Sequence, residues 1–261
     1  MNYTKKSLGQ NYLIDSNIIR KITSLVTIYN KNILEIGPGK GALTEEILKY
    51  KPKSLILVEK DNILSKELKL KYQNNNKIKI YNKDILKKNI EEKIQNNSIV
   101  FGNLPYNISS QILVKMIKFK KKPIKYSALI FMFQKEMAER IDGKFNTSKY
   151  GRLAILTNYR LEIMSKFNVS PNCFFPKPKI DSTVIHFQAK NKLPGKIKNI
   201  DNLEKITKLF FSNRRKMINK NIRKIFNKDQ LKTMNDLNLQ SRPSELNPDK
   251  YYEITEFFEK L

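Results

Sequence analysis

A glycine-rich turn near the start of the chain is the first segment that could do chemistry. Residues 35–41 read Glu-Ile-Gly-Pro-Gly-Lys-Gly, between an apolar run at 32–36 and a helical pattern at 42–50. In α/β folds such a turn follows the first strand, where glycines let the backbone approach a ligand closely. The spacing Gly37-x-Gly39-x-x-Ala42 also fits the dinucleotide fingerprint, so the turn alone leaves the ligand open.

Two carboxylates follow at the ends of the next two predicted strands. Glu59 stands 22 residues beyond Gly37 and ends the apolar run 54–59, where it can accept hydrogen bonds from both hydroxyls of a ribose. That position suits either NAD or S-adenosyl-L-methionine. Asp84 follows the strand candidate 77–81, as an acceptor for the amino group of adenine would. Each residue alone is more typical of a surface charge, but their placement at successive strand ends favours an adenosine site.

The fourth predicted strand, 98–102, ends in a turn of unusual composition. Residues 103–106 read Asn-Leu-Pro-Tyr, and nothing in nicotinamide chemistry requires these residues at this point. The turn therefore favours S-adenosyl-L-methionine over NAD as the ligand of the adenosine site.

Alternating strands and helices must position these residues. Strand candidates fall at 32–36, 54–59, 77–81, 98–102, 126–133 and 183–188, and helical patterns at 42–50, 63–70 and from 109 onward. This order predicts an α/β fold, Rossmann-like, with a mostly parallel sheet. A helix capped by Asp15 or Ser16 precedes it, and only helices are expected after a linker at 190–196. We expect a catalytic domain over 1–190, with a basic arm at 1–14, and a small all-helical RNA-binding domain over 191–261.

The charge of the chain indicates its partner. The sequence holds 51 Lys and Arg against 24 Asp and Glu, a net charge of +27. A polyanion relieves the self-repulsion of so basic a chain, so nucleic acid is the leading partner, although an AT-rich genome also enriches Lys. Residues 115–125 and 190–224 concentrate the positive charge. A solvated charge run is the alternative interpretation of the lysines at 120–122.

Several other classes are disfavoured. No apolar stretch approaches the roughly 20 residues that span a bilayer, and the N-terminus lacks the apolar core of a signal peptide, so a cytoplasmic protein without a membrane anchor is expected. Cys173 and His186 are the single residues of their types, which leaves neither an internal disulfide nor a zinc ligand set. We expect both to be packing residues and expect no metal.

Five motifs occur in the order of one known family. They are residues 6–13 (Lys-Ser-Leu-Gly-Gln-Asn-Tyr-Leu), 35–41, 103–106, 174–178 (Phe-Phe-Pro-Lys-Pro) and 211–216 (Phe-Ser-Asn-Arg-Arg-Lys). In these motifs nearly the whole chain resembles the ribosomal RNA adenine dimethyltransferases. It looks closer to the small-subunit enzymes than to the macrolide-resistance methylases of the large subunit, because of Arg-Arg-Lys at 214–216 and Arg-Pro-Ser-Glu-Leu at 242–246.

The resemblance implies an S-adenosyl-L-methionine-dependent enzyme that dimethylates the exocyclic amines of adenines in small-subunit ribosomal RNA. It would act as a monomer on the assembling subunit during ribosome biogenesis. The cofactor contacts implied are Asn11, Leu13, Gly37, Gly39, Glu59, Asp84 and Asn103. The RNA contacts expected are Lys115, Lys118, Lys121, Lys122, Arg214, Arg215 and Lys216.

The turn at 103–106 suits methyl transfer to an adenine amine. The lone pair of that amine is delocalised into the ring, so acceptors placed tetrahedrally around the nitrogen favour rehybridisation as charge develops. The side-chain carbonyl of Asn103 and the main-chain carbonyl of Leu104, held extended by Pro105, are such acceptors. No strong base is needed, because the cationic product loses its proton readily. Tyr106 would stack on one face of an extruded adenine and, by resemblance, Phe174 on the other.

Other functions remain as alternatives. A non-catalytic RNA-binding assembly factor would have no need of an intact 103–106 turn together with Glu59 and Asp84. The turn and the charge also disfavour a nucleotide-dependent oxidoreductase. A DNA adenine methylase would normally carry an acidic residue where Asn103 stands.

Overall fold

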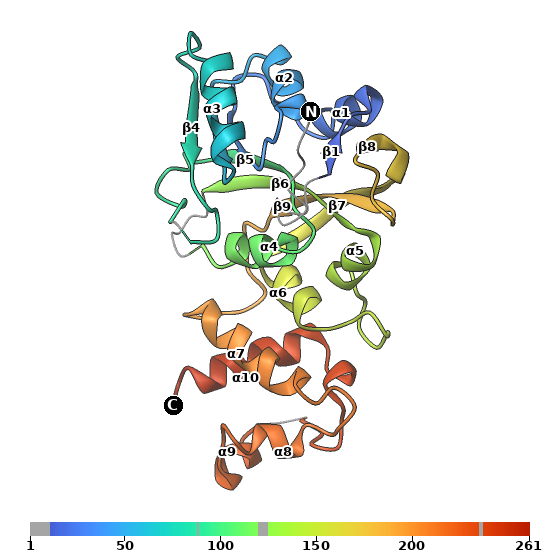
Figure 1. The fold of residues 1–261 in the computed structure, drawn as a ribbon. Helices are drawn as coiled ribbons and strands as arrows, with labels where there is room; N and C mark the ends of the chain where they lie inside the picture. The colour runs from blue at the N-terminus through green and yellow to red at the C-terminus, as the bar shows by residue number, and fades with distance from the viewer. Residues whose placement is uncertain (1–10, 88, 120–124, 235–236) are drawn as a thin grey trace. The chain divides into compact units, whose positions relative to one another are not determined.

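The chain forms two compact units. The computed structural model describes residues 11–87, 89–119, 125–234 and 237–261 (Figure 1). Contacts assign Met1–Ala138 and Glu162–Ala189 to the first unit, and Glu139–Leu161 and Lys190–Leu261 to the second. The boundary expected at 190/191 therefore differs from the observed division, because residues 139–161 belong with the C-terminal helices.

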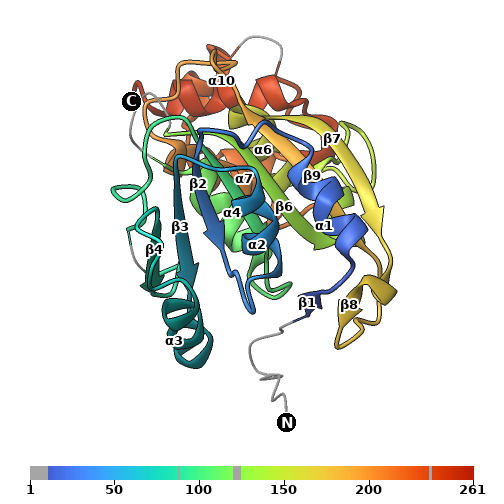
Figure 2. The same ribbon diagram turned by 90° about the horizontal axis from the view of Figure 1, so that it is seen from above.

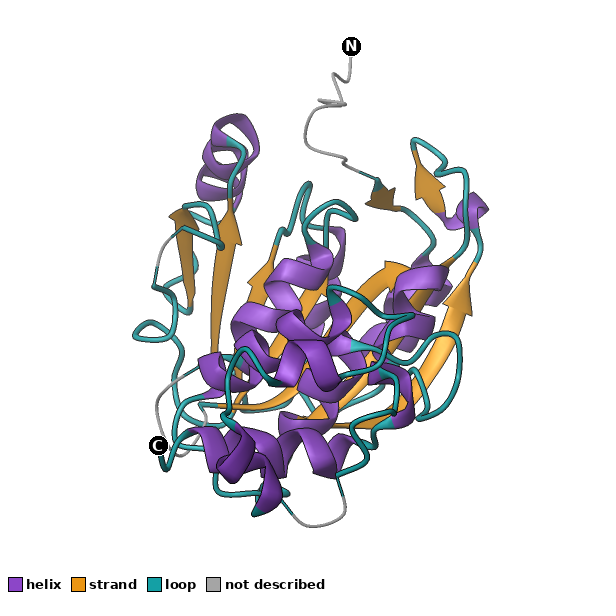
Figure 3. Ribbon diagram, turned by 90° about the horizontal axis from the view of Figure 1, so that it is seen from below, coloured by secondary structure: helices purple, strands orange, loops and turns teal. Residues whose placement is uncertain are grey.

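The first unit is built on a seven-stranded sheet with the strand order β4-β3-β2-β5-β6-β9-β7. Strands β2 to β6 pair in parallel, and β9 runs antiparallel to β6. Figure 3 shows the strands as one continuous layer. The strands are β2 (Asn32–Ile36), β3 (Ser54–Glu59), β4 (Ile78–Asn82), β5 (Ser98–Asn103), β6 (Tyr126–Gln134), β7 (Leu161–Val169) and β9 (Ser182–Ala189). The expected mostly parallel, Rossmann-like sheet is confirmed.

Helices cover both faces of this sheet. From β2 the chain moves outward through β3 to β4, and from β5 it moves the opposite way to β6, so right-handed crossovers place the connecting helices on opposite faces. Figure 1 shows α1 to α3 on one face and α4 on the other. The helices are α1 (Ser16–Thr23), α2 (Ala42–Lys49), α3 (Asn62–Lys71), α4 (Ser109–Ile117) and α5 (Lys135–Ile141). Asp15 is the N-cap of α1, as one of the two predicted caps, and accepts from the amides of Asn17 and Ile18.

The order of the strands creates a ligand-binding edge. Because β2 has β3 on one side and β5 on the other, the direction of the connections reverses between β2 and β5. In open α/β sheets a crevice forms at this point, beyond the carboxyl ends of the strands. The Gly37–Gly41 turn follows β2 there, and Asn103 ends β5.

A separate two-stranded ribbon lies beside that edge. Strand β1 (Tyr12–Leu13) pairs antiparallel with β8 (Phe174–Phe175), in the register Tyr12 to Phe175 and Leu13 to Phe174. The amide of Ile14 extends the pairing by donating to the carbonyl of Cys173 at 2.9 Å. Figure 2 shows β1 and β8 next to each other. The ribbon ties the N-terminal segment to residues about 160 positions later in the chain.

The second unit is helical and has a core rich in tyrosine. Its helices are α6 (Arg152–Arg160), α7 (Ile200–Phe211), α8 (Asn219–Ile222), α9 (Lys228–Lys232) and α10 (Pro248–Phe258). Buried hydroxyls donate to main-chain carbonyls, from Tyr150 to Leu246 and from Tyr252 to Ile155. These bonds join residues 139–161 to the C-terminal helices, which explains the observed division. No helix in the described part of the chain is long and apolar enough to cross a membrane.

Candidate active site

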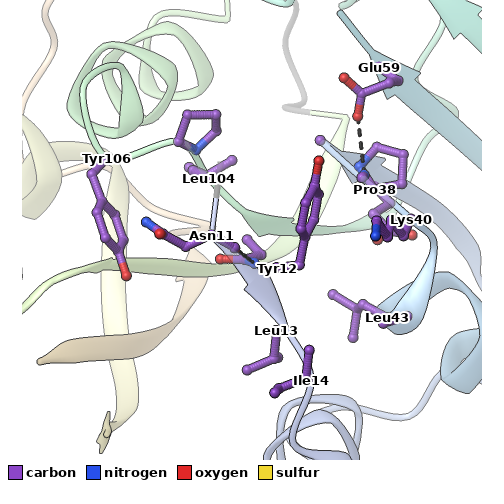
Figure 4. Close-up of a pocket in the computed structure, with 16 residues that line it drawn as sticks. Asn11, Tyr12, Leu13, Ile14, Pro38, Lys40, Leu43, Glu59, Leu104 and Tyr106 are labelled. Atoms are coloured by element: carbon purple, nitrogen blue, oxygen red, sulfur yellow. Dashed lines mark hydrogen bonds between the residues drawn. The ribbon is translucent and has the colours of Figure 1, made fainter. Parts of the chain in front are cut away.

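A cavity of about 150 Å³ opens at the carboxyl edge of the sheet. Four segments line it: the arm at Asn11–Ile14, the turn at 37–40, the end of β3 at Glu59, and the turn at 103–106. Figure 4 shows Glu59 and Tyr106 on opposite sides of the view, with Tyr12 between them. The structure therefore brings together residues that the sequence separates by more than 90 positions.

The glycines of the first turn have conformations that other residues rarely adopt. Gly37 and Gly39 have φ angles of +68° and +59°, in the left-handed region. A Cβ atom on Gly39 would lie 3.0 Å from the ring of Tyr12. The turn therefore needs glycine both for its backbone and for the close approach of the arm.

Glu59, the last residue of β3, connects the turn that follows β2 with the turn that follows β3. Its Oε2 accepts from the amide of Gly39 at 3.1 Å, and its Oε1 accepts from the amide of Asp61 at 2.8 Å. Burial raises the pKa of Glu59, whereas these backbone hydrogen bonds oppose the shift. Each carboxylate oxygen can accept more than one hydrogen bond, so the group keeps the capacity to bind a diol.

A second cavity, of about 110 Å³, continues from the first past Glu59. The two cavities share Gly37, Glu59 and Pro105. The second adds Asp84 and a group of apolar side chains, Ile36, Val58, Ile85, Ile108 and Ile112. Together the cavities form one continuous site, and its part beside Asp84 has apolar walls.

Asp84 is held ionised in that part of the site. Its carboxylate accepts from the amide of Leu86 at 2.9 Å and pairs with the ammonium of Lys60 at 3.0 Å. Partial burial pushes the pKa of Asp84 upward, but the Leu86 hydrogen bond and Lys60 outweigh it, and the pKa falls below its ordinary value. Asp84 can accept a hydrogen bond from the amino group of an adenine, and the apolar side chains beside it can pack against the adenine ring.

Asn103 is oriented by the arm. Its Nδ2 donates to the main-chain carbonyl of Asn11 at 3.1 Å. Because the amide nitrogen is used in this way, the side-chain carbonyl oxygen is the atom of Asn103 that can accept from another group.

Tyr106 is fixed at the other end of the turn. Its hydroxyl shares a 2.5 Å hydrogen bond with Ser182 on β9, and burial raises its pKa, so the phenol stays neutral. Leu104 is buried beneath the turn, and the carbonyl of Pro105 accepts from Ile108. The ring of Tyr106 is therefore anchored at its hydroxyl while the ring itself lines the first cavity.

The arrangement fits S-adenosyl-L-methionine. Carboxylates at Glu59 and Asp84 match the ribose and the adenine amine, and the apolar walls beside Asp84 match the adenine plane. Asn11 and Asn103 line the first cavity, where the methionine part would lie. Every residue predicted for the cofactor lines one of the two cavities.

Phe174 is the one predicted catalytic residue outside both cavities. It is 3% exposed and belongs to the hydrophobic core together with Leu13, its partner in the ribbon. Successive residues of a strand point to opposite faces, so Phe175 points away from this core and is 57% exposed. The structure thus separates the two adjacent rings, which the sequence alone does not distinguish.

The predicted RNA contacts have different environments. Lys115 is half-buried and donates to the carbonyl of Leu86 at 3.0 Å, which places it beside the Asp84 loop, and Lys118 is also half-buried. Lys121 and Lys122 lie outside the described residues. In the second unit, Arg215 and Lys216 are exposed. Arg214 is exposed too, but its guanidinium donates to the carbonyls of Thr147 and Ser148.

Sequence reasoning assigned no role to Glu35, Ser182 or the apolar residues of the second cavity. Glu35 lines the first cavity and is fully buried, and its Oε2 accepts from the hydroxyl of Thr44 at 2.6 Å. Burial raises the pKa of Glu35 to about 7, with Thr44 acting against the shift and Glu59 adding to it. The sequence feature that could have pointed to Glu35 is its position as a charged residue inside the apolar run 32–36.

The single cysteine and the single histidine both lie in the first unit. Cys173 is buried in the core of the first unit, and its Sγ lies 3.8 Å from a carboxylate oxygen of Asp15. His186 lies in β9, and burial lowers its pKa. Within the described ranges, no group of three or more His, Cys, Asp or Glu side chains could hold a metal ion.

A family model and individual relatives both place the chain in one protein family. The model of the family described as ribosomal RNA adenine dimethylase matches residues 1–260. The chain is 46% identical over 260 residues to ribosomal RNA small subunit methyltransferase A of Pelagibacter ubique, covering 98% of this chain and 97% of that protein. It is 37% identical over 253 residues to the protein of that name from Mycoplasma mobile, covering 95% of each.

Solved structures show the same fold. A dimethyladenosine transferase from Plasmodium falciparum superposes with a TM-score of 0.75 at 24% identity, covering 95% of this chain and 97% of that one. The 23S rRNA methyltransferase ErmE superposes with a TM-score of 0.67 at 21% identity, covering 95% of this chain and all of that one, 100%. At these identities the likeness concerns the fold alone.

Proposed function

Because the chain belongs to the ribosomal RNA adenine dimethylase family, we propose that it dimethylates the exocyclic amines of adenines in small-subunit ribosomal RNA. Family membership confirms the expected enzyme class and S-adenosyl-L-methionine as the methyl donor. The small subunit is supported by the names of the relatives from Pelagibacter ubique and Mycoplasma mobile. The non-catalytic and large-subunit alternatives are not favoured.

The orientation of Asn103 is the observation that carries the proposed mechanism. Its Nδ2 is bound to the carbonyl of Asn11, so its Oδ1 is presented as an acceptor in the cavity that Tyr106 also lines. An acceptor at this place binds an amine whose nitrogen is becoming tetrahedral more strongly than a planar one. Leu104, which precedes Pro105, supplies the main-chain carbonyl as the second acceptor.

The cofactor residues would place the methyl donor next to the target amine. When bound, S-adenosyl-L-methionine supplies a methyl group on a positively charged sulfur. Glu59 and Asp84 would hold the adenosine part, the first at the ribose and the second at the adenine amine. Asn11 and Asn103 would then lie near the methionine part, beside the acceptors for the target amine.

The target base requires a flat, fixed partner. Tyr106 supplies it, since the hydrogen bond between its hydroxyl and that of Ser182 restrains the ring. An adenine must leave its stack to reach the cavity, and stacking on an aromatic ring is worth about 1–3 kcal/mol per base. Leu104 is buried at this turn and lines the same cavity.

Affinity for RNA would come from the basic surface. The exposed Arg215 and Lys216 of the second unit are suited to phosphate contacts, which give affinity and salt dependence rather than sequence choice. We infer action in the cytoplasm, as a monomer, on the assembling subunit.

A transfer assay on both ribosomal subunits tests this function. The protein is incubated with methyl-labelled S-adenosyl-L-methionine and with immature small subunits or with large subunits, each lacking its adenine methylation. Label should enter only the small-subunit RNA. Label entering large-subunit RNA instead would overturn the substrate assignment, and no transfer to either would overturn the activity.

A further inference from the structure

The ribbon of β1 and β8 has two chemically different faces. Leu13 and Phe174 are directly paired, and both are buried in the core. Tyr12 and Phe175 are the other direct pair, so their side chains lie on the opposite face. Tyr12 lines the first cavity, and Phe175 is more than half exposed. An exposed aromatic ring thus lies next to the wall of the active site.

The surroundings of Phe175 are basic. Lys177 and Lys179 follow it in the same segment, and both are exposed. The apolar Ile180 next to them is also exposed. Across the ribbon, the ammonium of Lys40 lies 5.2 Å from the centre of the Tyr12 ring. Asp181 is the exposed acid nearest in sequence, and it follows the two lysines. An aromatic ring among cations is the combination that binds single-stranded nucleic acid, with phosphates on the cations and a base on the ring.

We propose that Phe175 is a stacking platform for an unpaired nucleotide next to the target adenine. This inference rests on the proposed function, because the occupant is the same RNA. The target adenine enters the cavity beside Tyr106, whereas the neighbouring base lies outside it on the ring of Phe175. Lys177 and Lys179 then contact the connecting phosphates. Phe175 is in this account an RNA-binding residue that takes no part in the transfer step.

The chain allows a direct optical test, because it contains no tryptophan. In Phe175→Trp the introduced indole is the single tryptophan, and a base stacked on it quenches its fluorescence. The control is Leu70→Trp, since Leu70 is also exposed, at 69%, and lies on α3. Immature small subunits lacking the adenine methylation should quench the tryptophan at 175 and leave the one at 70 unchanged. Equal signals from the two positions would overturn the proposal.

Binding and kinetics provide the second test. Phe175→Ala should weaken binding to immature small subunits by about 5- to 150-fold, the range that corresponds to one lost base stack. Phe175→Tyr should bind like the wild type, and so should the control Leu70→Ala. The apparent KM for the subunit should rise in Phe175→Ala while kcat stays within about twofold. Unchanged binding, or a loss confined to kcat, would contradict the inference.

The two proposals fail in distinguishable ways. If wild-type protein transfers no methyl group to small subunits, the proposed function is wrong whatever Phe175 does. If the wild type transfers methyl groups, but Phe175→Ala and Leu70→Ala bind immature small subunits with the same affinity, the proposed function is retained. In that case Phe175 is not a stacking platform.

Discussion

The side-chain amide of Asn103 donates to the main-chain carbonyl of Asn11, a residue 92 positions earlier in the chain. This bond joins the arm to the end of β5 and leaves Oδ1 as the atom of Asn103 that would accept from the target amine in the proposed mechanism. The arm is held in place by its pairing with β8. In the proposed function, cofactor binding and base positioning would therefore both depend on this arm.

Asn103→Ala should reduce the rate of methyl transfer by about a hundred- to a thousandfold or more, because an acceptor for the developing charge is lost. Binding to immature small subunits should stay near the wild-type value. Asn103→Asp keeps an acceptor but places a carboxylate oxygen opposite the carbonyl of Asn11, so it should also be slower than wild type. Single-turnover transfer and filter binding measure the two effects. Wild-type transfer by Asn103→Ala would refute the proposed role.

Glu35 should make stability depend on pH. Its pKa is raised from 4.5 to about 7, so the neutral form is favoured in the folded protein. This stabilisation is complete below pH 4.5 and is lost as the pH rises through 7, a loss of about 3 kcal/mol in the free energy of unfolding. Glu35→Gln should lack the loss and be more stable than wild type at pH 8.

Urea unfolding at several values between pH 5 and 8 measures the contribution of Glu35. The matched control is Glu45→Gln, an exposed residue on α2, which should follow the wild-type profile. Parallel profiles for Glu35→Gln and wild type would show that Glu35 is ionised throughout this range.

Gly39→Ala and Gly37→Ala should differ in their coupling to Tyr12. Both substitutions place a residue at a positive φ, which costs about 1–2 kcal/mol. Only the Cβ at position 39 approaches the Tyr12 ring, whereas the nearest atom to the one at 37 lies 3.9 Å away. In double-mutant cycles with Tyr12→Leu, thermal unfolding should show coupling for Gly39→Ala and additivity for Gly37→Ala. Equal coupling at both positions would contradict the described contact.

Arg214 and Arg215 should have different roles despite their adjacency. Arg215→Ala should lower the slope of log affinity against log salt by about one, as expected for a lost phosphate contact, and leave thermal stability unchanged. Arg214→Ala removes donors to Thr147 and Ser148 and should lower the unfolding temperature. Salt titrations and thermal melts on both variants measure the difference. The reverse pattern would show that Arg214 is the RNA contact.

The sequence predicted the parts of the fold that depend on local patterns. Apolar runs gave most strands to within a residue, and the ends of those strands gave Glu59, Asp84 and Asn103, because parallel strands end at a common edge. Strand β7 was not predicted, since only its two end residues are buried and polar residues interrupt the apolar ones between them. The membership of residues 139–161 in the second unit was also missed, because it depends on contacts such as Tyr150 to Leu246 across 96 positions.

The remaining details of the site depend on pairing and on side-chain partners. Which of Phe174 and Phe175 faces the core is set by the register with β1, and no local pattern encodes that register. Lys115 lies in a run of lysines and was expected at the RNA, yet its ammonium donates to the carbonyl of Leu86. A basic residue therefore has a partner in the fold that charge counting does not reveal.

Nucleoside analysis of the reacted RNA identifies which base is methylated and how many methyl groups it carries. Small-subunit RNA from immature particles is treated with the protein and S-adenosyl-L-methionine, digested to nucleosides and examined by mass spectrometry. We expect adenosine carrying two methyl groups on its exocyclic amine, formed by the wild type and absent with Asn103→Ala. A methylated nucleoside other than adenosine, or dimethyladenosine formed equally by the alanine variant, would contradict this expectation.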